Sequence, residues 1–182
     1  MKISKRIISL ILIAAFIFAL PVNASAKAIK AGEKPENAVI LKEGKNLIKF
    51  SANWEKTSYA KLKVKDKKAK YKIKFSNLRA SGEKPENSCV GIAISLGYMN
   101  KNGKLKEYTF PPVDDISSGK RTWISMISKG GEGKLDIDTT MFFDYSIDYE
   151  GEKNAECYII LSPQSDSNNK QNTVRIDIKK IG

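Results

Sequence analysis

Apolar and polar residues alternate with a period of two along most of this chain after residue 26. The pattern is most regular in residues 60–64 and 71–75, where each apolar side chain alternates with a lysine. Successive side chains of a β-strand point to opposite faces, so this alternation is typical of strands with one buried face. No stretch after residue 26 shows the 3.6-residue period of an amphipathic helix. The pattern predicts an all-β fold.

The same test marks about ten short strands separated by turn-forming residues. They are 38–41, 47–52, 59–65, 70–75, 89–98, 105–110, 121–128, 135–138, 141–149, 158–161 and 174–178. We expect 59–65 and 70–75 to form one amphipathic hairpin. A second hairpin is expected around residues 100–103, because Asn-Gly tolerates positive φ. So many short strands predict a two-sheet antiparallel β-sandwich of jelly-roll type.

Residues 1–26 have the three-part order of a cleavable secretory signal peptide. Lys2, Lys5 and Arg6 precede an uncharged apolar run over 7–20, and the small residues 24–26 follow at a cleavage-site spacing. The run is shorter than the ~20 residues of a permanent membrane span, although a retained N-terminal anchor is the alternative. We therefore expect a single mature domain over 27–182, secreted or associated with the cell surface.

Positive charge is concentrated near the start of this mature domain. The whole chain has a formal net charge of +12, of which the signal contributes three positive charges. Residues 27–80 hold 16 Lys or Arg against 5 Asp or Glu, whereas residues 81–182 hold 13 against 15. Such an asymmetry indicates an electrostatic partner of opposite sign.

The predicted hairpin places six lysines on its polar face. These are Lys61, Lys63, Lys65, Lys70, Lys72 and Lys74. Like charges on neighbouring strands repel, so one interpretation of this face is a patch for an anionic cell-wall polymer, acidic glycan, lipid headgroup or extracellular nucleic acid. The alternative is a solvated face whose lysines discourage edge-to-edge aggregation. Lysine lacks the base-reading fork of arginine, and no aromatic residues interleave, which disfavours sequence-specific nucleic-acid recognition.

Catalytic and metal-binding patterns are mostly absent. The chain has no histidine, which excludes a Ser-His-Asp triad or a Cys-His pair, and we expect no enzymatic activity. Two cysteines without histidine do not make a structural zinc site. Calcium is the one cofactor that the sequence leaves open, with Asp114 and Asp115 in the loop Pro112–Gly119 as its candidate ligands.

The two cysteines, Cys89 and Cys157, both lie in strand-like apolar runs. Export permits a disulfide between them, which would close a long loop and stabilise the fold by ~4 kcal/mol. Buried free thiols fit the same runs equally well. Both alternatives stay open.

Several aromatic residues are candidates for exposed contact surfaces. Trp54 lies in a loop-like stretch, Tyr108 lies near a hairpin and Phe142 falls on the polar side of its strand, whereas Trp123 is expected in the core. Exposed rings can stack on sugars or on a protein partner. The second functional hypothesis is therefore an extracellular protein-binding module, such as an inhibitor or adhesin, with loops around Trp54 and Pro112–Gly119. Packing of Trp54 over the end of the sandwich is the alternative.

The hexapeptide Gly-Glu-Lys-Pro-Glu-Asn occurs twice, at 32–37 and at 82–87. The flanking residues of the two copies differ, so a polar turn used twice is favoured over a duplicated domain unit. Each copy precedes an apolar strand.

The stretch from Tyr59 to Val64, a short turn and then Tyr71 to Phe75 resembles the central hairpin of bacterial pre-peptidase C-terminal domains. The resemblance covers residues 47–78. It implies a secreted β-sandwich with a non-catalytic accessory role and carries over no functional residues. The chain departs from the family pattern at Lys56-Thr57-Ser58, where acidic residues would be expected before the aromatic.

Overall fold

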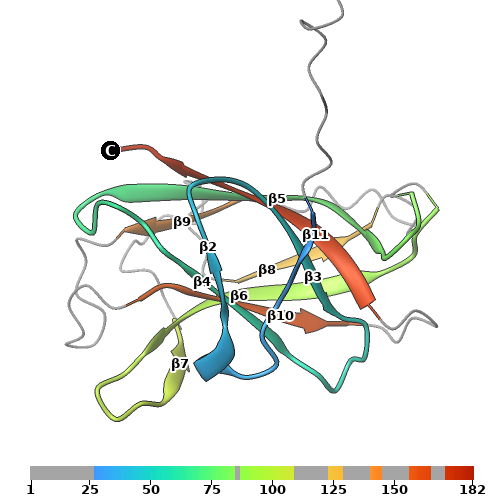
Figure 1. The fold of residues 1–182 in the computed structure, drawn as a ribbon, viewed down its shortest axis with the longest axis horizontal. Helices are drawn as coiled ribbons and strands as arrows, with labels where there is room; N and C mark the ends of the chain where they lie inside the picture. The colour runs from blue at the N-terminus through green and yellow to red at the C-terminus, as the bar shows by residue number, and fades with distance from the viewer. Residues whose placement is uncertain (1–26, 85–86, 109–122, 129–139, 145–155, 165–170) are drawn as a thin grey trace, which may run out of the picture.

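The computed structural model describes residues 27–84, 87–108, 123–128, 140–144, 156–164 and 171–182. These residues form eleven strands and one short 3-10 helix, η1 (Pro35–Asn37). The strands build two sheets that pack face to face, with β5 and β11 in the upper layer of Figure 1 and β6 and β10 in the lower. The predicted all-β two-sheet sandwich is confirmed. None of the described residues belongs to a helix long and apolar enough to cross a membrane.

We call the two layers sheet A and sheet B. Sheet A has the order β1-β3-β11-β5-β9, formed by Ile29–Lys30, Gly44–Ser51, Gln171–Lys180, Lys70–Ala80 and Thr140–Asp144. Sheet B has the order β2-β4-β10-β6-β7, formed by Val39–Leu41, Ser58–Leu62, Tyr158–Pro163, Gly91–Met99 and Leu105–Glu107. A further strand of sheet B, β8 (Trp123–Ile127), pairs with β6.

Eight of these strands have the connectivity of a jelly roll. In sheet A, β3-β11-β5-β9 are antiparallel neighbours, and in sheet B so are β4-β10-β6-β8. The chain crosses between the sheets at nearly every connection, so β11 at the C-terminus lies between β3 and β5. This ordering of two four-stranded sheets is that of two interlocked Greek keys.

Two features of the predicted sandwich are wrong. The sheets are mixed rather than purely antiparallel, because the short edge strands β1 and β2 run parallel to β3 and β4. The strands β4 and β5 do not form a hairpin, because β4 pairs in sheet B and β5 pairs in sheet A. Alternation along a strand reveals its buried face but not its neighbour. The hairpin that carries the family resemblance therefore does not form.

The second predicted hairpin is confirmed. Strands β6 and β7 are antiparallel and meet through Asn100–Gly103. Gly103 has a φ of 70°, and its N–H donates to the carbonyl of Asn100 at 2.9 Å. The side-chain oxygen of Asn100 also accepts from the N–H of Lys104 at 2.9 Å, which closes the turn.

The two hexapeptide copies make the same kind of connection. Each begins where the chain leaves sheet A, after β1 and after β5, and each leads into a strand of sheet B, β2 and β6. Asn37 N–H donates to the Lys34 carbonyl at 3.2 Å, and Asn87 N–H donates to the Lys84 carbonyl at 3.0 Å. The repeated sequence therefore corresponds to a repeated turn between layers, as the polar-turn interpretation expects.

The core lies between the two sheets. Its largest fully buried side chains come from the inward positions of both layers: Leu41, Ile48, Phe50, Tyr71, Ile73, Phe75, Leu78, Ile92, Ile94, Leu96, Ile124 and Met141. Most inward positions of sheet A are apolar, and its charged side chains lie on the outward positions.

A basic sheet face as the candidate functional site

The fold divides the six lysines of the predicted hairpin between the two layers. Lys70, Lys72 and Lys74 lie on β5 in sheet A, where all three are exposed. Lys61 lies on β4 in sheet B, and Lys63 follows it. Lys65 lies in the connection that crosses from one sheet to the other. The predicted single six-lysine face is therefore wrong.

Lys61 is bound within sheet B. Its ammonium group donates to a carboxylate oxygen of Glu156 at 2.9 Å and lies 5.8 Å from the centre of the Tyr158 ring. The hydrogen bond to Glu156 raises the pKa of Lys61 above its usual value. Because its ammonium group already contacts Glu156 and Tyr158, Lys61 is poorly placed to bind an external anion.

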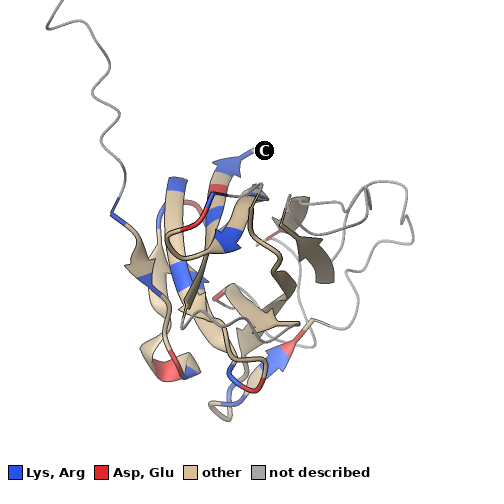
Figure 2. Ribbon diagram, turned by 90° about the vertical axis from the view of Figure 1, so that its right-hand side faces the viewer, with Lys and Arg blue, Asp and Glu red and all other residues tan. Residues whose placement is uncertain are grey.

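The three lysines of β5 join other cations on the outer face of sheet A, which we call the basic face. The register brings together outward side chains from β3, β11 and β5, far apart in the sequence: Lys45, Lys49, Lys70, Lys72, Lys74, Arg79, Arg175 and Lys179. Two carboxylates share the face, Asp144 and Asp177. Figure 2 shows Lys and Arg positions recurring along the adjacent strands of this layer. These eight cations and two carboxylates give the basic face a net charge of +6.

Two of these cations are paired. Lys70 contacts Asp144 at 3.4 Å and Arg175 contacts Asp177 at 3.3 Å. The other six cations of the basic face have no ion pair with any residue that the structure describes. Residues two apart on a strand are ~7 Å apart, which is within the ~8 Å Debye length at physiological salt. Their potentials therefore add at the surface.

The unpaired cations face one another across β11 in two pairs. Lys45 on β3 and Lys74 on β5 are both aligned with Asp177. Lys49 on β3 and Arg79 on β5 are both aligned with Thr173. The members of each pair are two strand spacings apart, about 10 Å, and the two pairs are four residues apart along β11, about 13 Å.

A β-bulge brings Arg79 onto this face. Even-numbered residues of β5 point outward up to Ser76, and the register then shifts opposite the segment between Thr173 and Arg175. Asn77, in the bulge, has a φ of 53°, a conformation that asparagine tolerates better than most residues. The extra residue changes the parity of the strand, so the odd-numbered Arg79 points outward.

Five residues of the basic face were not among the candidates predicted from the sequence: Lys45, Lys49, Arg79, Arg175 and Lys179. The alternation of Arg175, Asp177 and Lys179 with buried neighbours marks them as outward-facing. What the sequence does not reveal is that β11 inserts between β3 and β5. Only that pairing turns three separate strands into one charged surface.

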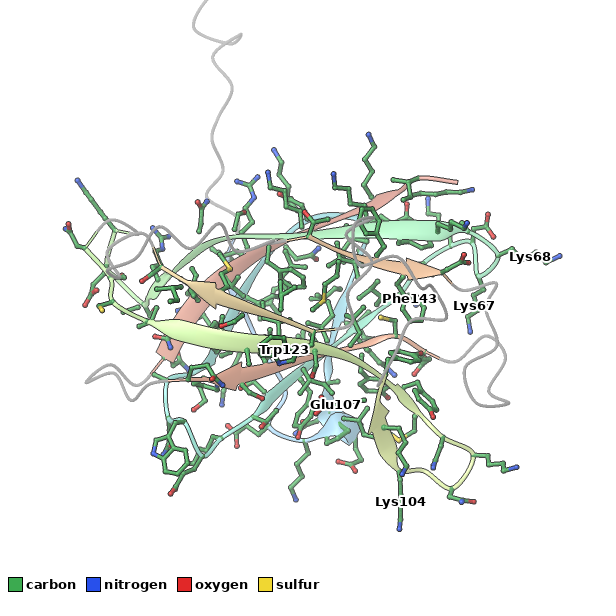
Figure 3. The ribbon with its side chains drawn as sticks, turned by 180° about the vertical axis from the view of Figure 1, so that it is seen from behind. Lys67, Lys68, Lys104, Glu107, Trp123 and Phe143 are labelled. Atoms are coloured by element: carbon green, nitrogen blue, oxygen red, sulfur yellow. The ribbon has the colours of Figure 1, made fainter. Side chains whose placement is uncertain are left out.

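The aromatic candidates differ in burial. Trp54 is 59% exposed, as a binding role would require, and the neighbouring residues 55–57 line an open groove of about 540 Å³. Tyr108 is buried and stacks on Tyr98 at 4.9 Å, so its predicted exposure is wrong. Phe142 lies on the outward side of β9, as expected. Trp123 is 56% exposed on β8, so its predicted place in the core is wrong (Figure 3).

The cysteines are both free in the structure, Cys157 buried and Cys89 exposed. Tyr158 is aligned with Gly97, so Cys157 lies beside Tyr98, nine residues along the chain from Cys89. That separation is about 30 Å of extended chain, whereas a disulfide needs Cα atoms within about 7 Å. Of the two alternatives that the sequence left open, the structure has the free thiols. Burial raises the pKa of the Cys157 thiol well above its usual value.

The calcium candidates Asp114 and Asp115, with the loop Pro112–Gly119, lie outside the described residues, as does the signal segment 1–26. Within the described part of the chain, no group of three or more His, Cys, Asp or Glu residues could hold a metal ion.

Comparisons with known proteins found no match: no family model, no curated protein and no solved structure is similar to this chain.

Proposed function

We propose that this chain is an exported, non-catalytic binding module that associates with an anionic polymer or glycan of the cell envelope through the basic face of sheet A. The observation that carries the proposal is the set of six cations on one sheet surface that form no ion pair within the described part of the chain. Like charges gathered on one surface repel one another, and a bound polyanion would relieve this repulsion by pairing with each of them. The proposal takes the signal-like order of residues 1–26 as support for export to where such polymers occur.

The chemistry of the face favours charge over sequence as the recognised property. Five of the six unpaired cations are lysines, which act as point charges without a rigid hydrogen-bonding fork. Their aliphatic stems and the flat sheet surface suit a flexible polymer with repeated phosphate, sulfate or carboxylate groups. Sequence-specific nucleic-acid recognition is not part of the proposal.

The proposal is tested by comparing a charge-reversal variant on sheet A with a charge-reversal variant elsewhere on the molecule. A variant with Lys72→Glu and Lys74→Glu should lose most of its binding to isolated cell wall and to a soluble acidic glycan. A matched control, Lys63→Glu with Lys104→Glu, makes the same change in net charge. Lys63 follows β4 in sheet B, and Figure 3 shows Lys104 projecting from the lower layer, so this control should bind nearly as the native protein does.

Equal losses in the two variants would show that only the net charge matters, and no loss in either would refute the proposal. Binding that is insensitive to salt and is abolished by Trp54→Ala would instead favour the protein-binding alternative.

A further inference from the structure

The geometry points to one extended, unbranched polyanion lying along β11, held between the two cation pairs that face each other across that strand. This inference rests on the proposed function and specifies how the polymer lies on the basic face. The first support is the register. Lys45 and Lys74 flank Asp177, and Lys49 and Arg79 flank Thr173, so the two pairs lie on the same line along β11.

The surface of β11 between the pairs carries little net charge. Arg175 and Asp177 neutralise each other at 3.3 Å, and Thr173 is uncharged and only 4% exposed. The potential is therefore highest on the two flanks, β3 and β5, and a linear anion above β11 is attracted from both sides at once. A polymer crossing β11 at right angles would meet only one of the two pairs.

The end of this strip carries another cation. Lys179 lies on β11 opposite Lys72, two residues beyond Asp177, and both lysines are exposed. From Thr173 to Lys179 the strip is six residues long, about 20 Å. This length sets the size of the polymer segment that the face holds. The polymer must be unbranched because cations flank the strip on both sides.

The length requirement is tested with polyphosphate chains of defined length as the probe, measured by titration calorimetry on the full-length mature domain. Affinity should rise steeply from inorganic triphosphate to chains of about 20 Å. For longer chains it should increase only in proportion to the number of equivalent positions at which the chain can bind. An affinity that is independent of length, or that is fully developed with triphosphate, would overturn the inference.

The orientation is tested with two neutralised variants. Lys45→Gln with Lys74→Gln removes one pair, and Lys49→Gln with Arg79→Gln removes the other. If the polymer lies along β11, each variant should weaken binding of the long chain by about five- to tenfold, and each should shorten the length at which affinity levels off. Loss of binding in only one of the two variants would show that the polymer crosses the strand.

These outcomes are separate from failure of the proposed function. A native protein that binds no polyphosphate at all, or variants that bind as well as it does, would refute the basic face as the site. A native protein that binds in a salt-dependent manner without the length effect would retain the proposed function and overturn only the alignment. The control Lys63→Gln with Lys104→Gln should leave both affinity and length dependence unchanged.

Discussion

Two asparagines illustrate how single residues support or strain this sandwich. Asn46 is partly exposed, and its amide group donates to the carbonyls of Lys42 at 2.9 Å and Gly44 at 3.1 Å, which fixes the entry into β3. Asn172 is fully buried at an inward position of β11, and neither polar atom of its side chain has a hydrogen-bond partner among the residues that the structure describes. A buried polar group without a partner costs about 1–3 kcal/mol.

We predict opposite effects from the same substitution at these two positions. Asn172→Leu, which keeps the branched shape, should raise the free energy of unfolding by about 1–2 kcal/mol because it removes the unsatisfied amide. Asn46→Leu should lower it by about 1–2 kcal/mol because it breaks the turn contacts. Chemical denaturation of both variants measures the two effects. A loss of stability in Asn172→Leu as large as that in Asn46→Leu would contradict the inference that the Asn172 amide destabilises the fold.

At the scale of elements, the bulge in β5 decides which side chains reach the basic face. The buried residues Tyr71, Ile73 and Phe75 are odd-numbered, whereas the buried residues Leu78 and Ala80 are even-numbered. The change of parity occurs at Asn77, whose φ is 53°. Arg79 is thereby brought to the outer face, opposite Thr173.

Substitutions at Asn77 should therefore depend on the backbone conformation they tolerate. Asn77→Gly should keep or slightly raise stability, whereas Asn77→Val should lower it by about 1–2 kcal/mol because a β-branched residue disfavours positive φ. Thermal unfolding of the pair provides the measurement. Equal stability of the two variants would argue against a left-handed residue at this position.

The elements also show which features of the fold the sequence patterns predict and which they do not. Alternation correctly predicts the buried faces of β5, β9 and β11, and Asn100–Gly103 correctly predicts the β6–β7 turn. The partner of each strand is a property of the whole chain, because a jelly roll places consecutive strands in opposite sheets. For that reason Lys72 and Lys74 are correctly identified as outward-facing, whereas Lys61 and Lys63 are assigned to a surface that they do not share.

At the scale of the whole molecule, the two layers have different surfaces. Sheet A presents lysines and arginines on its outer side, whereas outward residues of β6 and β10 in sheet B, such as Ser95, Tyr158 and Ile160, are buried. The positive charge of residues 27–80 is therefore not spread evenly around the sandwich. The C-terminal strand, from the part of the chain with no excess of positive charge, completes the basic face by joining β3 to β5.

The central claim is that six cations of sheet A contact one polyanion, and its most direct test is the salt dependence of binding. The logarithm of the association constant for single-stranded homopolymeric DNA, used as a generic polyanion, should fall linearly with the logarithm of the salt concentration. Six contacts predict a slope of about −4, since each contributes about −0.7 for a single strand. Neutralising Lys45, Lys49, Lys72 and Lys74 should reduce the slope to about −1.4. A slope near zero in the native protein, or one unchanged in the variant, would contradict the account.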